Sequence, residues 1–305
     1  MDAILQAIEA VNRKLPELES RRNEPLKNHT SFKIGGPVRS MFFPESPAGL
    51  GALIAILGGC GVIPLVIGNG TNLLAGDGAL DLVVINTTGL NSIGQTGECE
   101  LSAEAGASLS KLAVFAFGCG LSGLEFAHGI PGTLGGAVSI NAGAYGAEMA
   151  DVVIRTRVIR VNTGMITVAG EEHEFSYRHS RFSNSGEIIL SSDIRLCKGD
   201  PEKIREVMDR LNDRRRDSQP LDLPSAGSVF KRPGTGYAAE LIEQAGLKGY
   251  TSGGAQVSEK HSGFIVNRGG ASFTDVMSVI EHVRETVFKQ FGIELELEIK
   301  VVAGG

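Results

Sequence analysis

The order of hydrophobic and polar residues predicts a mixture of helices and strands. Residues 2–18 carry apolar side chains at helical spacing and predict an amphipathic helix. From residue 32 to residue 197, short apolar runs separated by glycine-rich turns predict strands, with few helices between them. The strands are predicted at 62–67, 82–85, 101–105, 152–161, 188–190 and 194–197, and the helices at 49–57 and 108–117. This irregular order is typical of the α+β class and not of a regularly alternating parallel sheet.

The composition changes at residues 199–201. Asp200 is suited to cap a helix and Pro201 to occupy its first position, so a charged helix is predicted from there to about Arg216. Two further helices are predicted, one over 236–245 and one that begins at a capping box formed by Ser272 and Asp275. Strict alternation over 293–301 predicts a terminal strand. We therefore expect two domains, residues 1–199 and residues 200–305.

Charge and glycine content narrow the classes of ligand. The 305 residues include 29 Lys and Arg against 35 Asp and Glu, a formal net charge of -6. The electrostatic field of the whole protein therefore does not attract nucleic acid or an anionic membrane. An anionic ligand must be bound by groups in its immediate surroundings. The chain has 41 glycines, roughly twice the usual share of about 7%. Such a content favours tight turns or backbone that approaches a ligand closely.

Cysteine usage and the amino terminus favour a cytoplasmic protein. The four cysteines form no C-x-x-C pair and have no histidine at metal-ligand spacing, which disfavours structural zinc. The amino terminus lacks the basic start and apolar stretch of a signal peptide, so we expect free thiols in a reducing compartment. Residues 48–76 carry no charge, but glycines at 58–61 and Pro64 divide them into pieces too short to span a membrane.

Two glycine-rich segments are candidates for ligand binding. Residues 67–74 follow a predicted strand and could turn backbone N–H groups toward a phosphate, although a tight turn explains them equally simply. Residues 129–146 are rich in glycine and nearly free of charge, as expected of backbone wrapped around a large flat cofactor. Neither G-x-G-x-x-G nor the P-loop motif G-x-x-x-x-G-K-[ST] occurs, which disfavours a Rossmann fingerprint and a P-loop hydrolase.

Several polar clusters leave alternatives open. Ser228 lies three residues before Lys231, an S-x-x-K spacing found in serine acyltransferases, but residues 108–111 match as well, and S-D-N and K-T-G are missing. His173 and His179 do not form H-E-x-x-H. The segment 177–182 is either a solvated loop or an arginine clamp for an anion. A run of three arginines could bind a diphosphate or form the solvent-exposed end of a helix: Arg214, Arg215 and Arg216. Glu294, Glu296 and Glu298 share one strand face as exposed carboxylates.

Taken together, these segments resemble one family, the UDP-N-acetylenolpyruvoylglucosamine reductases. The matching stretches follow the family order and span nearly the whole chain: residues 29–36, 67–74, 129–146, 177–180, 225–233, 253–255, 264–267 and the terminal glutamate-rich segment. The resemblance implies an FAD-binding fold of the vanillyl-alcohol-oxidase (PCMH) type in residues 1–199, built from two lobes. A smaller α+β substrate-binding domain follows in residues 200–305.

The resemblance also implies the reaction and the residues that serve it. It implies that NADPH reduces non-covalent FAD, which then reduces UDP-N-acetylglucosamine enolpyruvate to UDP-N-acetylmuramate for peptidoglycan synthesis. It gives Ser228 as proton donor, Glu298 as assisting acid and Arg178 as the cation beside the substrate carboxylate. The implied cofactor contacts are Gly68, Asn69, Gly70, Thr71, Asn72, Gly132, Thr133, Gly135, Gly136, Ser139, Asn141, Ala142 and Gly143. The implied substrate contacts are Tyr177, Arg216, Lys231 and Arg232.

This chain departs from one branch of the family, and other functions stay open. The connection between residues 194 and 202 is too short for the tyrosine-bearing insertion of the longer branch, so the chain resembles the shorter branch. Arg232 stands where the longer branch has Asn. The alternatives are an oxidase with flavin linked to His29 or His128, an S-x-x-K acyltransferase, and a nucleotide-sugar binding protein without catalysis. The lack of a long exposed apolar run favours a monomer.

Overall fold

The chain forms two compact units, each built from segments far apart in the sequence. The computed structural model describes residues 2–161, 164–234 and 236–303. Unit 1 comprises Met1–Arg22, Ser40–Asn69 and Leu82–Arg214, and unit 2 comprises Asn23–Arg39, Gly70–Asp81 and Arg215–Gly305. Helices and strands alternate irregularly in both units, which confirms the α+β class. The predicted division into residues 1–199 and 200–305 concerns function and stays a prediction.

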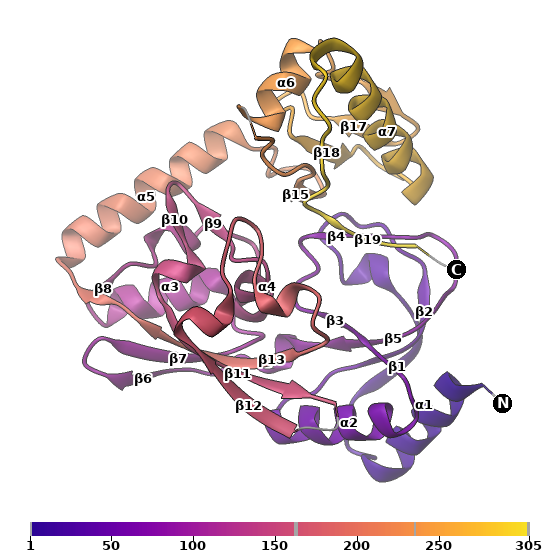
Figure 1. Ribbon diagram of the computed structural model, residues 1–305, viewed down its shortest axis with the longest axis vertical. Coiled ribbons are helices and arrows are strands. Elements are labelled where there is room, and N and C mark those ends of the chain that lie inside the picture. Colours follow the sequence, from indigo (N-terminus) through magenta and orange to yellow (C-terminus); the bar gives the residue numbers. More distant parts are fainter. Residues whose placement is uncertain (1, 162–163, 235, 304–305) are drawn as a thin grey trace. The chain divides into compact units, whose positions relative to one another are not determined.

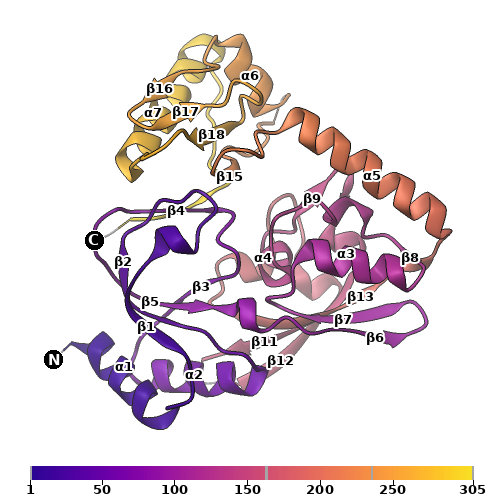
Figure 2. The same cartoon turned by 180° about the vertical axis from the view of Figure 1, so that it is seen from behind.

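A five-stranded antiparallel sheet is the main layer of unit 1. Its strands run in the order β12 (Gly164–Ala169), β11 (Val153–Arg160), β13 (Ile188–Arg195), β7 (Glu100–Glu104) and β6 (Ile93–Gly97). The helices α3 (Leu109–Gly118) and α4 (Leu134–Ser139) lie on the same side of this sheet in both ribbon views (Figures 1 and 2). Their apolar side chains share one buried cluster with the sheet residues Leu101, Ala103 and Ile194. The sheet therefore provides the surface against which α4 and its flanking loops pack.

The remaining elements of unit 1 include two amino-terminal helices. In α1 (Ala3–Lys14), the Asp2 carboxylate accepts a hydrogen bond from the Leu5 amide at 3.1 Å, as an N-cap should. This helix contacts α2 (Pro47–Gly59) through a second buried cluster. The short strands of unit 1 are β3 (Leu65–Ile67), β8 (Leu121–Ser122), β9 (Gly143–Ala144), β10 (Ala147–Glu148) and β14 (Cys197–Lys198). The 3₁₀ helices of both units are Leu26–Asn28, Thr87–Gly89, Glu125–Ala127, Met149–Asp151, Gly170–His173 and Arg181–Ser183.

The chain changes unit within three strands of one sheet, within one helix, and once in the loop between Asn69 and Gly70. A four-stranded sheet has the order β1 (Ser20–Pro25), β2 (Pro37–Phe42), β5 (Leu80–Asn86) and β3, with β3 parallel to β5. The strands β1, β2 and β5 each change unit within their length. The helix α5 (Pro201–Ser218) does the same at Arg214. Its first turn is capped by the Asp200 carboxylate, which accepts from the Glu202 amide at 3.0 Å, so the predicted start is confirmed.

Unit 2 packs two helices on a small antiparallel sheet. The order is β15 (Ser225–Ser228), β18 (Phe264–Asn267), β17 (Ala255–Val257) and β16 (Thr251–Ser252), with α6 (Ala238–Gln244) and α7 (Phe273–Phe291) beside it. The capping box predicted for α7 is present, since Ser272 Oγ accepts from the Asp275 amide and Asp275 accepts from the Ser272 amide. The predicted apolar stripe is buried at Val276, Val279, Ile280, Val283 and Val287. A parallel pair of β4 (Leu73–Ala75) and β19 (Lys300–Val302) completes the unit.

Three predicted strands differ from the structure. The segments 188–190 and 194–197 were each predicted as a strand, but β13 runs through Ser191, Ser192 and Asp193 without a break. These polar residues suggest a turn, yet Ser192 and Asp193 are buried because partners on β11 satisfy them. The terminal strand predicted over 293–301 is confined to β19, with one isolated bridge between Phe230 and Leu297. Alternation alone does not form a strand where a continuous partner strand is missing.

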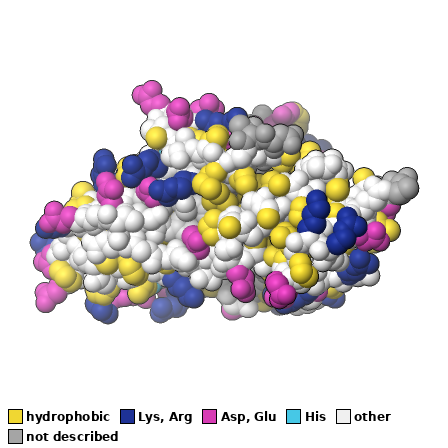
Figure 3. Space-filling view, turned by 90° about the horizontal axis from the view of Figure 1, so that it is seen from below, with side chains coloured by type: hydrophobic (Ala, Val, Ile, Leu, Met, Phe, Trp, Pro, Cys, Tyr) yellow, Lys and Arg dark blue, Asp and Glu magenta, His cyan; other side chains and the backbone are white. Residues whose placement is uncertain are grey.

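The uncharged segment from residue 48 onward forms α2 and β3, as the two pieces expected from its glycines and Pro64. Leu50, Leu53, Ile54 and Leu57 of α2 are buried, while Ala48 and Ala55 face solvent. From below, apolar side chains gather over the face where α2 lies (Figure 3). Within the described residues, no helix combines the length and apolar character needed to cross a membrane.

Candidate active site

The two glycine-rich segments meet within unit 1. A Cβ atom built on Gly68 would lie 2.1 Å from Thr133 Oγ1, so only glycine allows the first segment to pack this closely on the second. Thr133 is itself buried at the start of α4. Sequence reasoning named both segments separately, and the structure places them in contact. Residues of both can therefore contribute to one binding surface.

The glycines of α4 have two different functions. A Cβ on Gly135 would lie 2.9 Å from Ala105 Cβ, so this glycine lets α4 rest directly on the chain beside the sheet. Gly136 is exposed, and the nearest atom to its added Cβ would be Thr133 Oγ1 at 3.8 Å. Gly135 therefore permits close packing of α4, whereas Gly136 leaves main-chain atoms exposed at the surface of the helix. Exposed main-chain atoms next to a closely packed surface suit the binding of a large flat ligand such as FAD.

Arg178 lies at the tip of a tight turn. Ser176 and His179 exchange two main-chain hydrogen bonds of 3.0 and 3.1 Å, which leaves Tyr177 and Arg178 as the two tip residues. Arg178 has a φ of +53°, a left-handed conformation that costs free energy in a non-glycine residue. Its guanidinium donates to the Gly143 carbonyl at 3.2 Å. This bond joins the arginine predicted to clamp the substrate carboxylate to the second glycine-rich segment.

Ser228 lies at the end of β15 in unit 2, immediately after a bulge. The register between β15 and β18 shifts between Ser225 and Ser228, and Gly227 has a φ of +77°. A bulge with glycine in the left-handed region turns the next side chain away from the regular alternation of a strand. Ser228 is half-buried. The bulge therefore decides where its hydroxyl points.

Glu298 is brought to Ser228 by main-chain pairing. The Glu298 amide donates to the Val229 carbonyl at 2.8 Å, one residue after Ser228, and Phe230 forms a bridge with Leu297. Glu294 and Glu296 are exposed, whereas Glu298 is half-buried. The sequence predicted three equivalent exposed carboxylates, and the structure separates Glu298 from the other two. Only the resemblance to the family had singled it out.

The first glycine-rich segment continues into unit 2 and holds Glu298 from its other side. Asn72 Nδ2 donates to the Glu298 carbonyl at 3.0 Å, and the Lys300 amide donates to the Asn72 carbonyl at 2.9 Å. Gly70 has a φ of +58°, and an added Cβ would lie 2.1 Å from the His29 carbonyl oxygen. The predicted cofactor residues Gly70, Thr71 and Asn72 therefore lie next to the predicted acid within one unit.

The predicted substrate contacts are divided between the units. Tyr177 is 48% exposed beside Arg178, whose guanidinium lies 5.3 Å from the centre of its ring. In unit 2, the Arg232 guanidinium lies 4.2 Å from the centre of the Tyr237 ring. Lys231 is paired with Glu296 at 3.3 Å, and the Arg216 carbonyl accepts from Lys260 Nζ at 2.5 Å. Lys231 and Arg232 therefore flank the Ser228 segment, and Arg216 lies in the same unit.

Two buried carboxylates and a buried histidine lie in the same unit as the Arg178 turn. Burial alone would raise the pKa of Glu187, but hydrogen bonds from Arg181, Arg160 and Ser185 outweigh it and hold the pKa below its usual range. The same balance, with Arg157 as the main donor, lowers the pKa of Asp193. Burial lowers the pKa of His173. No group of three metal-ligating side chains occurs among residues 2–161, 164–234 and 236–303.

Sequence reasoning missed three features of this site. The Gly227 bulge was not recognised, although a glycine inside a short strand is a known bulge signal. Asn141 and Ser180 were not identified as connectors between the turn and α4, because their partners are main-chain carbonyls that no sequence pattern marks. His29 and His128, proposed as flavin attachment points, have hydrogen-bond partners in Glu24 at 2.8 Å and Asn212 at 2.7 Å.

Comparison with known proteins identifies the family. A family model described as the C-terminal domain of UDP-N-acetylenolpyruvoylglucosamine reductase matches residues 219–302, and one described as an FAD binding domain matches residues 38–170. The UDP-N-acetylenolpyruvoylglucosamine reductase of Caldanaerobacter subterraneus subsp. tengcongensis is 50% identical to this chain over 280 residues, 92% of each protein. Both glycine-rich segments fall within the FAD-binding match, and Ser228 and Glu298 fall within the other.

Solved structures agree with this result. The crystal structure of the reductase from Thermus caldophilus has a TM-score of 0.80 and 32% identity, covering 93% of this chain and 98% of that one. Alkyldihydroxyacetonephosphate synthase, with 15% identity and a TM-score of 0.50 over 64% of this chain and 40% of that one, shares the fold alone. The predicted FAD-binding fold of the vanillyl-alcohol-oxidase type is thereby confirmed. The chain belongs to the UDP-N-acetylenolpyruvoylglucosamine reductase family.

Proposed function

We propose that Ser228, Glu298 and Arg178 carry out the family's reaction in this chain. The reaction is the FAD-dependent reduction of UDP-N-acetylglucosamine enolpyruvate to UDP-N-acetylmuramate with NADPH, a step in peptidoglycan precursor synthesis. The observation that supports the assignment most strongly is the hydrogen bond from the Glu298 amide to the Val229 carbonyl. It brings the acid beside the segment that carries Ser228, through contacts that do not depend on either side chain.

The chain offers residues of the right kind for FAD. Contacts are proposed for residues 68–72 and for a set in the second glycine-rich segment: Gly132, Thr133, Gly135, Gly136, Ser139, Asn141, Ala142 and Gly143. The close contact of Gly68 with Thr133 and the bare backbone at Gly136 support this fit. FAD held by these residues would supply the hydride chemistry, with NADPH as the hydride source and the terminal carbon of the enolpyruvyl group as the acceptor. The protein's part is to hold the substrate at hydride-transfer distance and to exclude water.

The three catalytic side chains act on the charge that this transfer leaves. Negative charge develops on the carbon next to the carboxylate and on the carboxylate itself, so a fixed cation from Arg178 stabilises it. Glu298 assists by a hydrogen bond or a shared proton. Ser228 then donates its proton to that carbon. A serine hydroxyl is a weak acid, so this step requires a strongly basic acceptor within hydrogen-bond distance.

The finer features of the function rest on the same proposal. The residues proposed to bind the nucleotide sugar are Tyr177, Arg216, Lys231 and Arg232, the three cations on its diphosphate or uridine side. Residues 1–199 are proposed to bind FAD and residues 200–305 the substrate. We expect a cytoplasmic monomer without nucleic-acid or membrane partners. Nothing in this assignment requires a metal ion.

Product analysis tests the proposal. The protein, saturated with FAD, is incubated with NADPH and the enolpyruvyl substrate in the absence of oxygen. The expected result is one NADPH consumed for each product molecule, with a product two hydrogen atoms heavier than the substrate. An oxidase would leave the substrate unreduced and use oxygen when it is supplied, and a binding protein would leave both reactants unchanged. Either result would contradict the proposed reaction.

A further inference from the structure

We propose that Asn141 is a positioning residue that fixes Arg178 on the flavin-binding segment. This inference rests on the proposed function, in which Arg178 stabilises the charge on the substrate carboxylate. Family resemblance gave Asn141 only as a cofactor contact. Its side-chain amide instead bonds to two main-chain groups of the protein, one of them in the Arg178 turn.

The contacts of Asn141 support this role. Its side chain is fully buried. Its Nδ2 donates to the Ser176 carbonyl at 3.1 Å, and its Oδ1 accepts from the Ala150 amide at 2.9 Å. The Ser176 carbonyl also accepts from the His179 amide, the bond that closes the turn. Asn141 therefore holds the base of the turn, while its own amide donates to the Val138 carbonyl at 3.3 Å.

Asn141 adopts a conformation that only a few residue types tolerate. Its φ is +44°, in the left-handed region that asparagine enters more readily than most other residues. Such strain persists where surrounding contacts determine the conformation, and it is concentrated at functional sites. The two amide bonds are contacts of that kind. Asparagine is thus suited both to the backbone and to the hydrogen bonds at this position.

Ser180 supports the same connection on the other side of the turn. Its buried hydroxyl donates to the Ser139 carbonyl at 2.7 Å, and Ser183 Oγ donates to the same oxygen at 2.7 Å. Ser139 is the last residue of α4, so this carbonyl needs a partner outside the helix. With the bond from Arg178 to Gly143, the turn is tied to the flavin-binding segment at three successive places.

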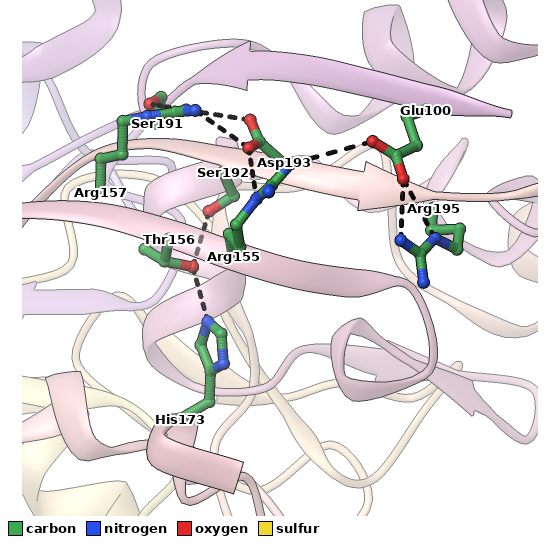
Figure 4. Close-up of polar contacts among 9 residues, drawn as sticks. All are labelled: Glu100, Arg155, Thr156, Arg157, His173, Ser191, Ser192, Asp193 and Arg195. Carbon is green, nitrogen blue, oxygen red and sulfur yellow. Dashed lines mark hydrogen bonds and ion pairs between the residues drawn. The ribbon is translucent and has the colours of Figure 1, made fainter. Parts of the chain in front are cut away.

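The segment that precedes the turn is fixed to the sheet. His173 Nε2 and Thr156 Oγ1 are 2.9 Å apart, and Thr156 Oγ1 and Ser192 Oγ are 3.0 Å apart. Figure 4 shows these three side chains in line on one face of β11 and β13. The His173 ring also stacks on Phe175 with centroids 4.8 Å apart. The turn is therefore held by the sheet before it and by the flavin-binding segment beside it.

The consequence is a mechanical link between flavin binding and the carboxylate clamp. Asn141 belongs to the flavin-binding segment and bonds to the Arg178 turn. Any contact that fixes the conformation of the flavin-binding segment therefore also fixes the turn. Asn141→Asp keeps the size and the acceptor to Ala150 but replaces the donor by an oxygen facing the Ser176 carbonyl. We expect Arg178 to be displaced. A displacement of about 1 Å can slow a reaction roughly 100-fold.

The test measures both half-reactions in a double-mutant cycle of Asn141→Asp and Arg178→Ala. Asn141→Asp should reduce flavin reoxidation by the enolpyruvyl substrate roughly 10- to 100-fold. Both side-chain amide atoms of Asn141 bond to the protein itself, so the substitution removes no side-chain contact to FAD, and reduction by NADPH and FAD content should stay within about twofold. In the Arg178→Ala background, Asn141→Asp should have almost no further effect, because residues that act through one another are not additive. A merely structural role would lower both half-reactions in both backgrounds.

Controls separate this inference from the proposed function. Asn91→Asp loses a similar donor bond, to the Thr88 carbonyl at 3.1 Å on the surface, and should leave both half-reactions unchanged. If Asn141→Asp does not fold, Ser180→Ala gives the same test through the Ser139 carbonyl. If Arg178→Ala leaves reoxidation unchanged, the proposed function is wrong about Arg178. If Arg178→Ala is slow and both positioning variants are as fast as the native protein, the further inference is wrong.

Discussion

The Arg178 turn and the Ser228 segment place catalytic groups in different ways. Arg178 is held mainly by side chains, since Asn141 and Ser180 bond to main-chain carbonyls around it. Ser228 and Glu298 are placed by the main chain, through the bulge at Gly227 and the hydrogen bond between Glu298 and Val229. The first region therefore depends on the identity of several side chains, and the second on backbone conformation at one glycine.

This difference determines how each region should fail. An isosteric change can remove a side-chain donor without altering the fold, so the Arg178 turn should lose its alignment gradually. A main-chain pair survives most substitutions, because every residue except proline supplies the same N–H and C=O. The Ser228 segment should therefore tolerate change until its backbone is strained. Three substitutions examine this contrast, from the largest expected effect to the smallest.

Removing the Ser228 hydroxyl should produce the largest effect. In Ser228→Ala, main-chain pairing is unchanged, so FAD binding and reduction by NADPH should be normal. Loss of a general acid slows a step by roughly 100- to 10,000-fold, and reoxidation by substrate should fall within that range. Stopped-flow absorbance of each half-reaction measures this. Ser225→Ala, on the same strand, is the matched control, and equal loss of both half-reactions in Ser228→Ala would contradict the assigned role.

Replacing Glu187 should weaken the region around the Arg178 turn. Its buried carboxylate pairs with Arg181 and Arg160, and Glu187→Gln should lower the free energy of unfolding by about 3 kcal/mol at pH 7. Because the pKa of Glu187 is lowered in the folded protein, its stabilisation is complete above the unfolded value near 4.5 and is lost as the pH falls through the folded value.

Urea unfolding between pH 7 and pH 3 measures both effects. The native protein should lose stability below about pH 4.5, and Glu187→Gln should lose less over the same range. Glu285→Gln is the control, because Glu285 is 68% exposed and its pair with Lys289 should contribute only a few tenths of a kcal/mol. Identical acid sensitivity of the native protein and Glu187→Gln would show that this carboxylate does not stabilise the fold.

Straining the bulge should have the smallest effect on stability and still disturb catalysis. At Gly227 an added Cβ meets no atom within 4 Å, so Gly227→Ala introduces only the strain of a φ of +77°. That strain costs about 1 kcal/mol. Flavin reoxidation should slow about tenfold, the equivalent of 1.4 kcal/mol, as Ser228 is turned away. Gly246→Ala, with a φ of +74° in equally open space, should cost the same stability without slowing the reaction.

If both alanine variants react at the native rate, the bulge does not direct Ser228. If both are slow, strain anywhere in unit 2 disturbs the reaction, and the special role of the bulge is lost. Only slow Gly227→Ala beside fast Gly246→Ala supports the contrast between the two regions.

Local sequence patterns predicted the elements that local physics determines. The helices starting at Pro201 and Phe273 follow from their caps, and the stripe from Val276 to Val287 follows from its period. The glycine-rich segments were identified from composition alone. The strand β13 was split in the prediction because burial of Ser192 and Asp193 depends on partners 36 residues away in the chain. No local pattern contains those partners.

The site was predictable only in part. The chemistry of Ser228, Glu298 and Arg178 followed from resemblance to a family, and the residues alone left an acyltransferase and a solvated loop open. The sequence cannot show that the Glu298 amide meets the Val229 carbonyl, because this pair joins segments 69 residues apart through main-chain atoms. The role of Asn141 was hidden for the same reason, since its partners are a carbonyl and an amide. The chemistry of a side chain can be inferred from a sequence more readily than the main-chain contacts that hold the side chain in place.

The visible spectrum of the purified protein through one anaerobic cycle tests the central claim most directly. The protein should be yellow, lose its colour with NADPH, and recover it only after addition of UDP-N-acetylglucosamine enolpyruvate. Denaturation should release the FAD, because no covalent link is expected. Colourless protein that does not take up FAD, or reduced protein that stays colourless with that substrate, would contradict the assignment of this chain as a flavin-dependent reductase.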